Sequence, residues 1–408
     1  MSNILGSDIS LQLFSEVSSV CVKNNIRYYI IGDAAINMYL HDEFATNGSI
    51  AIYAEDANRF LKAIQKELNE TRGLDFMKEN PRFPSCFFRY SDLNTVDCTL
   101  DKLRLYKYNC IHLDIKLIKG TGKSGIKASF QKKIYQAYKI SNVLSTKGKS
   151  MKYKALRQGT IFFRRVLGMR FSANRAYNAF ISSSNAQGKN VKIGKYKYER
   201  NVFDKPVKMD RKGLEVWFPS DIERYFQITY GEKWSHSNVK QVNLSKERVL
   251  SKNTKWEDFQ QRLIELGINN YYKNIKRYER QNRMFNIYNK KVRKYYDILE
   301  RTNDRFLLYT QFFPRKDELL ELYKKQDFYT LKRILKPYIL SLEKNAKKGL
   351  GVCFDKDIFD ITMEIYVHEG KIKRSKVLRN LVPEDHWKPI RIKDYNGKYI
   401  NFDKGQCQ

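Results

Sequence analysis

Short runs of alternating apolar and polar residues occupy the first 145 residues, as expected for strands that bury one face. In Ser49–Ala54, Ile50 and Ile52 lie on one face of the predicted strand, and Ser49 and Ala51 lie on the other. Further strands are predicted at Arg27–Gly32, Cys86–Tyr90, Leu103–Tyr108 and Cys110–Leu117. The period of two places the following residues in the core of one mixed sheet: Ile30, Ile31, Ile50, Ile52, Ile111, Leu113 and Ile115.

Helices are predicted between these strands. Glu55–Glu70 has apolar residues at three- and four-residue spacing, and two further helices are expected at Ile31–Leu40 and Gln131–Ser141. Strands interrupted by helices are typical of an α/β or α+β domain. The predicted fold class is therefore α/β (α+β), with a mixed sheet, helical elaborations around it and a long helical C-terminal region.

The pattern changes after about residue 145 to a basic, mostly helical sequence, with a loop near Ser182–Lys197. Phe218–Gly231 is a well-marked helix, in which Ser220 and Glu223 form a capping box and Gly231 suits the C-terminal position. Long helices follow from about residue 255. The predicted domains are residues 1–145, an α/β core; 146–250, a helical elaboration that closes the site; 251–350, a basic long-helix region; and 351–408, a small C-terminal appendage.

Residues 271–299 combine an apolar stripe rich in tyrosine with a strongly basic opposite face. One interpretation is an arm that binds a polyanion, with tyrosines available for stacking. The other is a helix that buries its tyrosines while its lysines are solvated, and the spacing favours this second interpretation for the tyrosines. Loss of RNA binding on reversal of Lys290, Lys291, Arg293 and Lys294 to Glu would support the arm.

The chain is strongly basic, with 77 Lys and Arg against 44 Asp and Glu and a formal net charge of +33. A charge of this sign attracts polyanions and steers phosphorylated substrates. The same excess arises in a lysine-rich proteome, because Lys, Asn, Ile and Tyr are abundant together here. Charge alone leaves both interpretations open.

The sequence predicts a cytoplasmic protein without a membrane span. No apolar run approaches the roughly 20 residues that a membrane helix needs. The N-terminus lacks the basic and apolar segments of a signal peptide. The six cysteines form no C-x-x-C pair and are expected to be reduced thiols.

Two common types of site are not supported by the motifs. Gly122–Ser124 follows a predicted strand as Gly-Lys-Ser, but a P-loop needs a glycine where this chain has Leu117. Lys123 remains a candidate phosphate contact in a flexible basic loop. The five histidines show no metal-ligand spacing with one another or with cysteines, so a zinc site is not expected.

Asp114 lies in the middle of a predicted strand, between Leu113 and Ile115. A carboxylate in such a place is costly unless it has a partner or a metal. For an isolated mid-strand aspartate a structural hydrogen bond is the expected partner. The preceding strand–helix–strand unit, with its turn at Gly32 and Asp33, favours a metal or phosphate site instead.

Residues of about 20–240 resemble the LicD/fukutin family of nucleotidyltransferase-fold phosphotransferases. Ile31–Ala34 is similar to the family's glycine turn, and Asp92–Thr95 to its short polar motif before the third acidic strand. Ile111–Ile115 resembles its I-x-I-D-I strand, and Phe218–Trp234 its proline–helix–Y-G-x-x-W element. In the family, this last element would close and buttress the donor pocket.

The resemblance implies a nucleotidyltransferase-like sheet and a particular reaction. A phosphoryl-alcohol would move from a CDP-linked nucleotide donor to a glycan hydroxyl, supported by Mg²⁺ or Mn²⁺. Asp114 would be a metal ligand, and the residues implied to line the donor site are Gly32, Asp33, Thr95 and Lys123.

The chain departs from the family on the strand after the glycine-turn helix. The family has D-x-D there, and this chain has Ser49 and Ala51. Mg²⁺ prefers carboxylate and phosphate oxygens, so Ser49 and Ala51 at these catalytic positions, beside Asp114, indicate a degenerate site. Ser49→Asp with Ala51→Asp is expected to be sterically mild and to recover metal-dependent nucleotide binding. If the chain is active instead, the ligands beside Asp114 have to come from Asp33, Asp42, Glu43, Glu55 or Asp56.

Two other functions fit the same fold. One is a template-independent nucleotidyltransferase that acts on nucleic acid. The other is a non-catalytic protein that binds RNA or another polyanion. A steep loss of nucleic-acid binding with salt would favour these two functions over a glycan acceptor.

Overall fold

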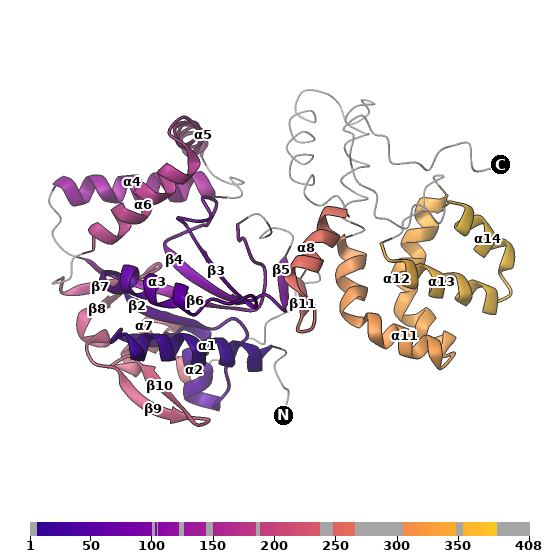
Figure 1. The fold of residues 1–408 in the computed structure, drawn as a ribbon, viewed down its shortest axis with the longest axis horizontal. Helices are drawn as coiled ribbons and strands as arrows, with labels where there is room; N and C mark the ends of the chain where they lie inside the picture. Colours follow the sequence, from indigo (N-terminus) through magenta and orange to yellow (C-terminus); the bar gives the residue numbers. More distant parts are fainter. Residues whose placement is uncertain are drawn as a thin grey trace. The chain divides into compact units, whose positions relative to one another are not determined.

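The computed structural model describes residues 6–99, 103, 105–121, 126–143, 150–184, 188–236, 248–265, 304, 306–347 and 354–381 (Figure 1). The chain divides into two compact units. One comprises residues 1–243 with 252–256, and the other residues 244–251 with 257–408. The predicted site residues all fall in the first unit, and the basic stretch 271–299 lies outside the described residues.

A mixed seven-stranded sheet forms the centre of the first unit. Its strands are β1 (Tyr28–Ile31), β2 (Ser49–Tyr53), β3 (Arg72–Phe76), β4 (Phe87–Asp92), β6 (His112–Thr121), β7 (Asn190–Ile193) and β8 (Tyr196–Glu199). The order is β1-β2-β6-β4-β3, and β7 joins β6 and β8 at one end. β2 and β6 are parallel, whereas β1–β2, β6–β4 and β4–β3 are antiparallel. The mixed α and β architecture that the sequence predicts is therefore confirmed.

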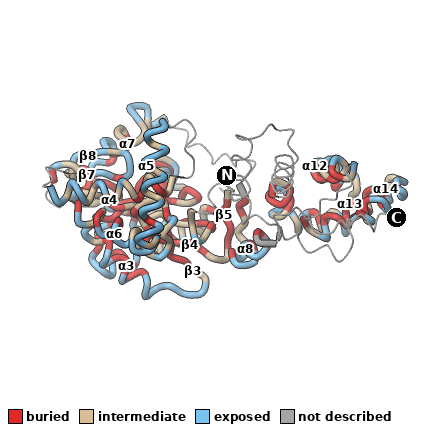
Figure 2. Tube along the Cα trace, turned by 90° about the horizontal axis from the view of Figure 1, so that it is seen from above, coloured by how far each residue is buried: buried red, intermediate tan, exposed pale blue. Residues whose placement is uncertain are grey.

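Helices surround this sheet (Figure 1). They are α1 (Ser7–Lys23), α2 (Gly32–His41), α3 (Ala57–Lys66), α4 (Ile126–Asn142), α5 (Met151–Val166), α6 (Met169–Ser182) and α7 (Ile222–Tyr230). α1 and α3 cover one face, because Phe14 packs edge-on against Tyr28 of β1 and Phe60 packs against Phe88 of β4. α4 packs against α5 and α6, and most of α5 is exposed (Figure 2).

The sheet residues that the pattern placed in the core are buried. All seven predicted core residues are 2% exposed or less. Both faces of β1 and most of β2 are buried, since Ala51 and Tyr53, on the face opposite Ile50 and Ile52, also lie below 9% exposure. The alternating pattern therefore predicted the strands and one buried face correctly, but not the second covered face.

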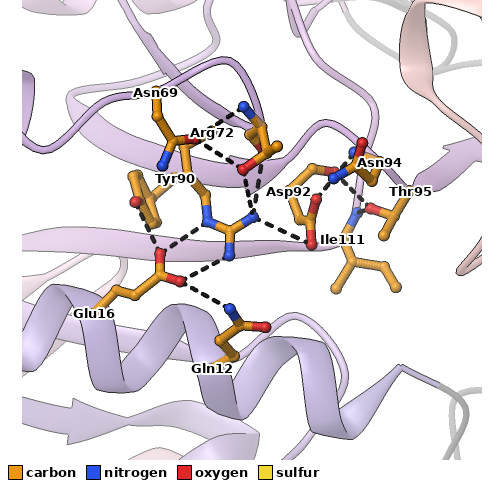
Figure 3. A network of polar contacts seen from close by, with 10 residues as sticks. Gln12, Glu16, Asn69, Arg72, Tyr90, Asp92, Asn94, Thr95 and Ile111 are labelled. Atoms are coloured by element: carbon orange, nitrogen blue, oxygen red, sulfur yellow. Dashed lines mark hydrogen bonds and ion pairs between the residues drawn. The ribbon is translucent and has the colours of Figure 1, made fainter.

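A partly buried ion network holds the start of β6 beside the end of β4 (Figure 3). Arg72 donates two hydrogen bonds to Glu16 of α1, at 2.8 and 2.7 Å, and lies 3.3 Å from the Asp92 carboxylate. The Asp92 backbone N–H donates to the carbonyl of Ile111, and the Ile111 N–H donates to the Thr95 hydroxyl, both at 3.0 Å. The chain therefore enters β6 from a position held by both backbone and side-chain contacts.

The remaining elements are smaller or lie in the second unit. They are β5 (Val96–Thr99), the hairpin β9 (Val207–Arg211) and β10 (Leu214–Phe218), the 3-10 turn η2 (Arg200–Phe203), β11 (Arg248–Ser251), α8 (Trp256–Glu265), α11 (Lys316–Lys324), α12 (Phe328–Ala346), α13 (Lys356–His368) and α14 (Ile372–Leu381). In the second unit, Leu331, Leu335 and Tyr338 of α12 are fully buried, and Tyr338 packs edge-on against Phe354.

Three local predictions were wrong. The described residues of Leu103–Tyr108 form turns and irregular structure, not a strand. The predicted loop Ser182–Lys197 contains β7 and β8, so the region between 146 and 250 is less helical than expected. The cap of α7 is Asp221, whose side chain accepts a hydrogen bond from the Arg224 N–H, while Ser220 bonds to Lys205.

Candidate functional site

Four polar residues form a row across one face of the sheet. The parallel pairing of β2 and β6 sets Ser49 opposite Asp114. The antiparallel pairing of β6 with β4, and of β4 with β3, sets Arg89 opposite Asp114 and Asp75 opposite Arg89. Because directly paired residues of neighbouring strands point to the same side, these side chains share one face. We call Ser49, Asp114, Arg89 and Asp75 the polar row.

Asp114 is held by Arg89 in a two-pronged ion pair. The Nε and Nη2 atoms of Arg89 lie 2.8 and 3.2 Å from the two carboxylate oxygens of Asp114. The two side chains are only 8% and 17% exposed, and the guanidinium lies 3.6 Å above the ring centre of Tyr106. Burial opposes ionisation of Asp114, but the charge and hydrogen bonds of Arg89, together with smaller contributions from His112 and Lys116, hold the pKa of Asp114 below its usual range. The predicted metal ligand is therefore a partner of arginine.

Asp75 completes the row as a buried carboxyl with a raised pKa. Its Oδ2 accepts hydrogen bonds from the Lys107 N–H at 2.5 Å and the Asn80 amide at 3.3 Å, while Oδ1 has no partner among the described residues. Burial raises the pKa of Asp75 to about 6. Arg89 carries one charge and Asp114 already matches it, so the row is electrically neutral when Asp75 is protonated.

Asp75→Asn is expected to stabilise the protein at pH 7 and to leave it nearly unchanged at pH 4. The pKa of Asp75 is about 6 in the folded state, above its unfolded value, so ionisation opposes folding increasingly from about pH 4 to pH 6. Removing a shift of this size is worth about 1–3 kcal/mol at pH 7. Urea denaturation of both proteins from pH 4 to 8 measures the difference. A constant difference over that range would contradict the raised pKa.

His112 stands beside the polar row as a neutral imidazole. Burial, and then the nearby Arg89, lower the pKa of His112 to about 4. Its Nδ1 lies 2.7 Å from the Cys110 carbonyl, and its Nε2 lies 3.9 Å from Asp114, beyond hydrogen-bonding distance. Because the pKa of His112 is lowered on folding, the protein loses stability through His112 as pH falls from about 6.5 to 4. Asp75 has the opposite effect, since it destabilises the protein as pH rises. Comparing the unaltered protein with Asp75→Asn separates the contribution of Asp75 from that of His112.

Ala51 lies in the core instead of pointing into an open pocket. It is 0% exposed and pairs with Tyr29 of β1. The hydroxyls of Tyr29 and Tyr53, which share its face of the sheet, both donate to the carbonyl of Phe203 in η2. The expectation that Ala51→Asp is sterically mild was therefore wrong. A carboxylate there would have to displace packed core atoms, and burying it is costly unless it pairs with Lys116, its direct neighbour on β6.

The glycine turn is present, and protein groups occupy its exposed amide. Gly32 begins α2 with φ of +65°, and its N–H donates to the Tyr225 hydroxyl at 2.7 Å. The Tyr230 hydroxyl donates to Asp33 at 3.2 Å, and Trp234 packs on Phe226 at 4.9 Å between ring centres. The Phe218–Trp234 element therefore supports the N-terminus of α2, and its role in buttressing a donor pocket stays a prediction.

The hydroxyl of Thr95, another predicted donor-site residue, is engaged within the protein. Thr95 is buried, and its hydroxyl donates to the Asp92 carbonyl at 2.7 Å while accepting from the Ile111 N–H. That arrangement uses the hydroxyl in the network of Figure 3, and its contact with a donor stays a prediction. Lys123 lies outside the described residues.

The residues at this site do not fit a Mg²⁺ or Mn²⁺ ion. Ser49 offers a hydroxyl, Ala51 offers no ligand, and the Asp114 oxygens are both engaged by Arg89. Within the part of the chain that the structure describes, no three His, Cys, Asp or Glu side chains are grouped to hold a metal. The nearby carboxylates that the sequence offers as alternative ligands are not grouped with Asp114 in that part of the chain.

Arg89 and Asp75 were not among the residues predicted for the site. A signal was present, because Arg89 interrupts the apolar run Phe87–Phe88 and Tyr90 in a predicted strand. An arginine in such a strand needs a buried acid, and Asp114 was the mid-strand acid without an assigned partner. Asp75 gave no comparable signal, because β3 was not predicted.

No helix among the described residues is long and apolar enough to cross a membrane. The four cysteines that the structure describes, Cys21, Cys86, Cys98 and Cys110, are buried and form no disulfide with one another. No protein-family model matches the chain, and a search of curated proteins found no similar sequence.

Proposed function

We propose that this chain is a catalytically degenerate relative of the LicD-like phosphotransferases, built on a nucleotidyltransferase-like sheet. It binds a phosphate-bearing ligand and does not transfer a phosphoryl-alcohol from a CDP-linked donor. The observation that carries the proposal is the two-pronged Arg89–Asp114 pair, which occupies the carboxylate that a metal would need.

The surroundings of the pair support the same proposal. Phosphoryl transfer depends on positioning and on cations that neutralise the developing charge. At this site the second ligand position, Ala51, is closed by the aromatic layer of Tyr29, Tyr53 and Phe203. The positive charge beside Asp114 is a fixed guanidinium, and it is directed at the protein's own carboxylate.

Turnover assays with the unaltered chain test the proposal. CDP-linked donors and nucleoside triphosphates are supplied with Mg²⁺ or Mn²⁺ and a glycan or RNA acceptor, and product is separated by chromatography. We expect no transfer above the protein-free blank and no metal-dependent rise in melting temperature. Ordinary enzymatic turnover that is lost in folded Asp114→Asn would overturn the degenerate site.

A second candidate function is nucleic-acid binding without catalysis, favoured by the net charge of +33. Non-specific binding of this kind weakens steeply with salt, because each neutralised phosphate releases a counterion. A fall of several powers of ten in RNA affinity between roughly 50 and 200 mM salt would support it. The slope of log affinity against log salt concentration should be roughly proportional to the number of phosphates contacted. Salt-independent binding would exclude it.

A further inference from the structure

A lysine-lined pocket of about 840 Å³ lies in the first unit, beside the far half of β6. Strands β4, β6, β7 and β8 and helices α4 and α6 contribute to its walls. The lysines that line it are Lys116, Lys119, Lys132, Lys139, Lys192 and Lys197. No Asp or Glu of the described residues lines it, so its wall carries positive charge only.

These lysines are brought together by the fold, not by a charge run in the sequence. Lys116 and Lys119 come from β6, and Lys192 pairs directly with Lys119 across the β6–β7 ladder. On α4, the pocket residues include Lys132, Tyr135 and Lys139, a spacing of three and four that places them on one helix face. Like charges gathered from four elements oppose folding, so their presence in one concavity favours a ligand-binding role.

Lys119 shows how crowded these charges are. It is half-buried, its ammonium donates to the Ser183 hydroxyl, and it lies 4.6 Å above the ring centre of Phe180. Burial, followed by the neighbouring charge of Lys132 and also that of Lys192, lowers the pKa of Lys119 to about 8. An anion in the pocket would relieve this repulsion.

Hydrogen bonds hold the walls of the pocket in place. The Ser184 hydroxyl accepts the Gly120 N–H at 3.0 Å and so ties the end of α6 to β6. The Tyr135 hydroxyl lies 2.7 Å from that of Ser85 and accepts the Cys86 N–H at 3.0 Å, which ties α4 to the start of β4. The lysines therefore project from elements that are held together by hydrogen bonds, as a preorganised anion site requires.

We propose that this pocket binds a small molecule that carries three or more phosphate groups. One phosphate can engage only two or three ammonium groups, whereas a chain of phosphates can reach lysines on opposite walls. The volume lies within the 300–1,000 Å³ range, roughly, of small-ligand pockets. The lysines would neutralise the ligand's charge without a divalent metal. The proposal goes beyond the degenerate site, because it rests on other residues and holds whether or not the chain is an enzyme.

The experiment uses the full chain in EDTA, with inorganic tripolyphosphate as the probe and calorimetric titration as the measurement. The test variant is Lys132→Gln with Lys192→Gln, on α4 and β7. The matched control is Lys133→Gln with Lys195→Gln, two exposed lysines next to the same elements that do not line the pocket. Both variants lose the same charge, so a general field effect would weaken both equally.

We expect one tripolyphosphate per chain for the unaltered protein and the control, and a loss in affinity of about 10- to 100-fold or more for the test variant. No binding to the unaltered protein, or equal losses in both variants, would overturn the proposal. Orthophosphate binding as tightly as tripolyphosphate would overturn the requirement for several phosphates. If single-stranded RNA without a terminal triphosphate binds as tightly as tripolyphosphate, and the test variant loses that RNA binding, the ligand is not a small molecule and this part of the proposal is overturned.

Discussion

Arg89→Met is expected to lower the free energy of unfolding of the first unit by about 3–5 kcal/mol, because it leaves Asp114 buried without its partner. Methionine fills a similar volume, so the loss reports mainly on the unpaired carboxylate. Asp75 loses the same neighbouring charge, which raises its pKa further and favours its neutral form. Trp217 and Trp234 lie in this unit, and their fluorescence during urea denaturation measures the change.

Two further variants separate the buried pair from a general effect of losing an arginine. Arg59 forms an ion pair with Asp56 on the surface and is 51% exposed, so Arg59→Met is expected to cost less than about 1 kcal/mol. Arg89→Met combined with Asp114→Leu removes both charges and should recover most of the lost stability, because buried ion pairs can be replaced by apolar residues. A double variant as unstable as Arg89→Met alone would show that the packing, not the unpaired charge, sets the cost.

The strands around the candidate site were predictable because their apolar periodicity is strong. β1, β2, β4 and β6 lie within two residues or so of their predicted bounds, except that β6 extends to Thr121. Asp114 was also identified from sequence, since a carboxylate between Leu113 and Ile115 needs a partner. Its partner could not be chosen, because that choice depends on which strand lies beside β6.

Strand order is the information that the sequence lacks here. β6 pairs with β2, which precedes it by many residues, and with β4 on its other side. That order makes Ser49, Asp114, Arg89 and Asp75 neighbours although they come from four separate segments. The lysine-lined pocket depends in the same way on β7, which lay in a predicted loop and joins β6 next to Lys119.

The polar row and the lysine-lined pocket differ in the charge that each offers to a ligand. In the polar row, the positive charge of Arg89 is neutralised by Asp114, so little of it is directed at a ligand. Two residues along β6 from Asp114, Lys116 begins a wall of lysines with no acid of the described residues beside them. Of these two sites, the pocket and not the polar row offers cationic charge to a phosphate, and this difference supports our proposal of binding without transfer.

Arg72→Met is expected to be the second most destabilising of the substitutions considered, at about 2–4 kcal/mol, because it removes the centre of the network in Figure 3. The Arg72 side chain is 8% exposed and binds two carboxylates, that of Glu16 at 2.7 Å and that of Asp92 at 3.3 Å. Each keeps some support without it, since Tyr90 still donates to Glu16 and the Asn94 N–H to Asp92. The expected cost is therefore below that of losing Arg89.

The pH dependence and the local effect of Arg72→Met distinguish this network from simple loss of packing. Burial opposes ionisation of Glu16, but the hydrogen bonds from Arg72 and Tyr90 hold the pKa of Glu16 below its usual value. The stability that ionised Glu16 contributes is therefore lost as pH falls through that lowered pKa. The difference between Arg72→Met and the unaltered chain should shrink over the same acidic range. Hydrogen exchange should quicken at the Ile111 N–H, which donates to the Thr95 hydroxyl just before β6. The stability of Arg72→Lys should lie between those of Arg72→Met and the unaltered protein, because lysine keeps the charge but not the two-pronged geometry. Unchanged exchange at Ile111 in a destabilised Arg72→Met protein would show that the network does not hold the entry to β6, and that Asp114 is positioned by the sheet alone.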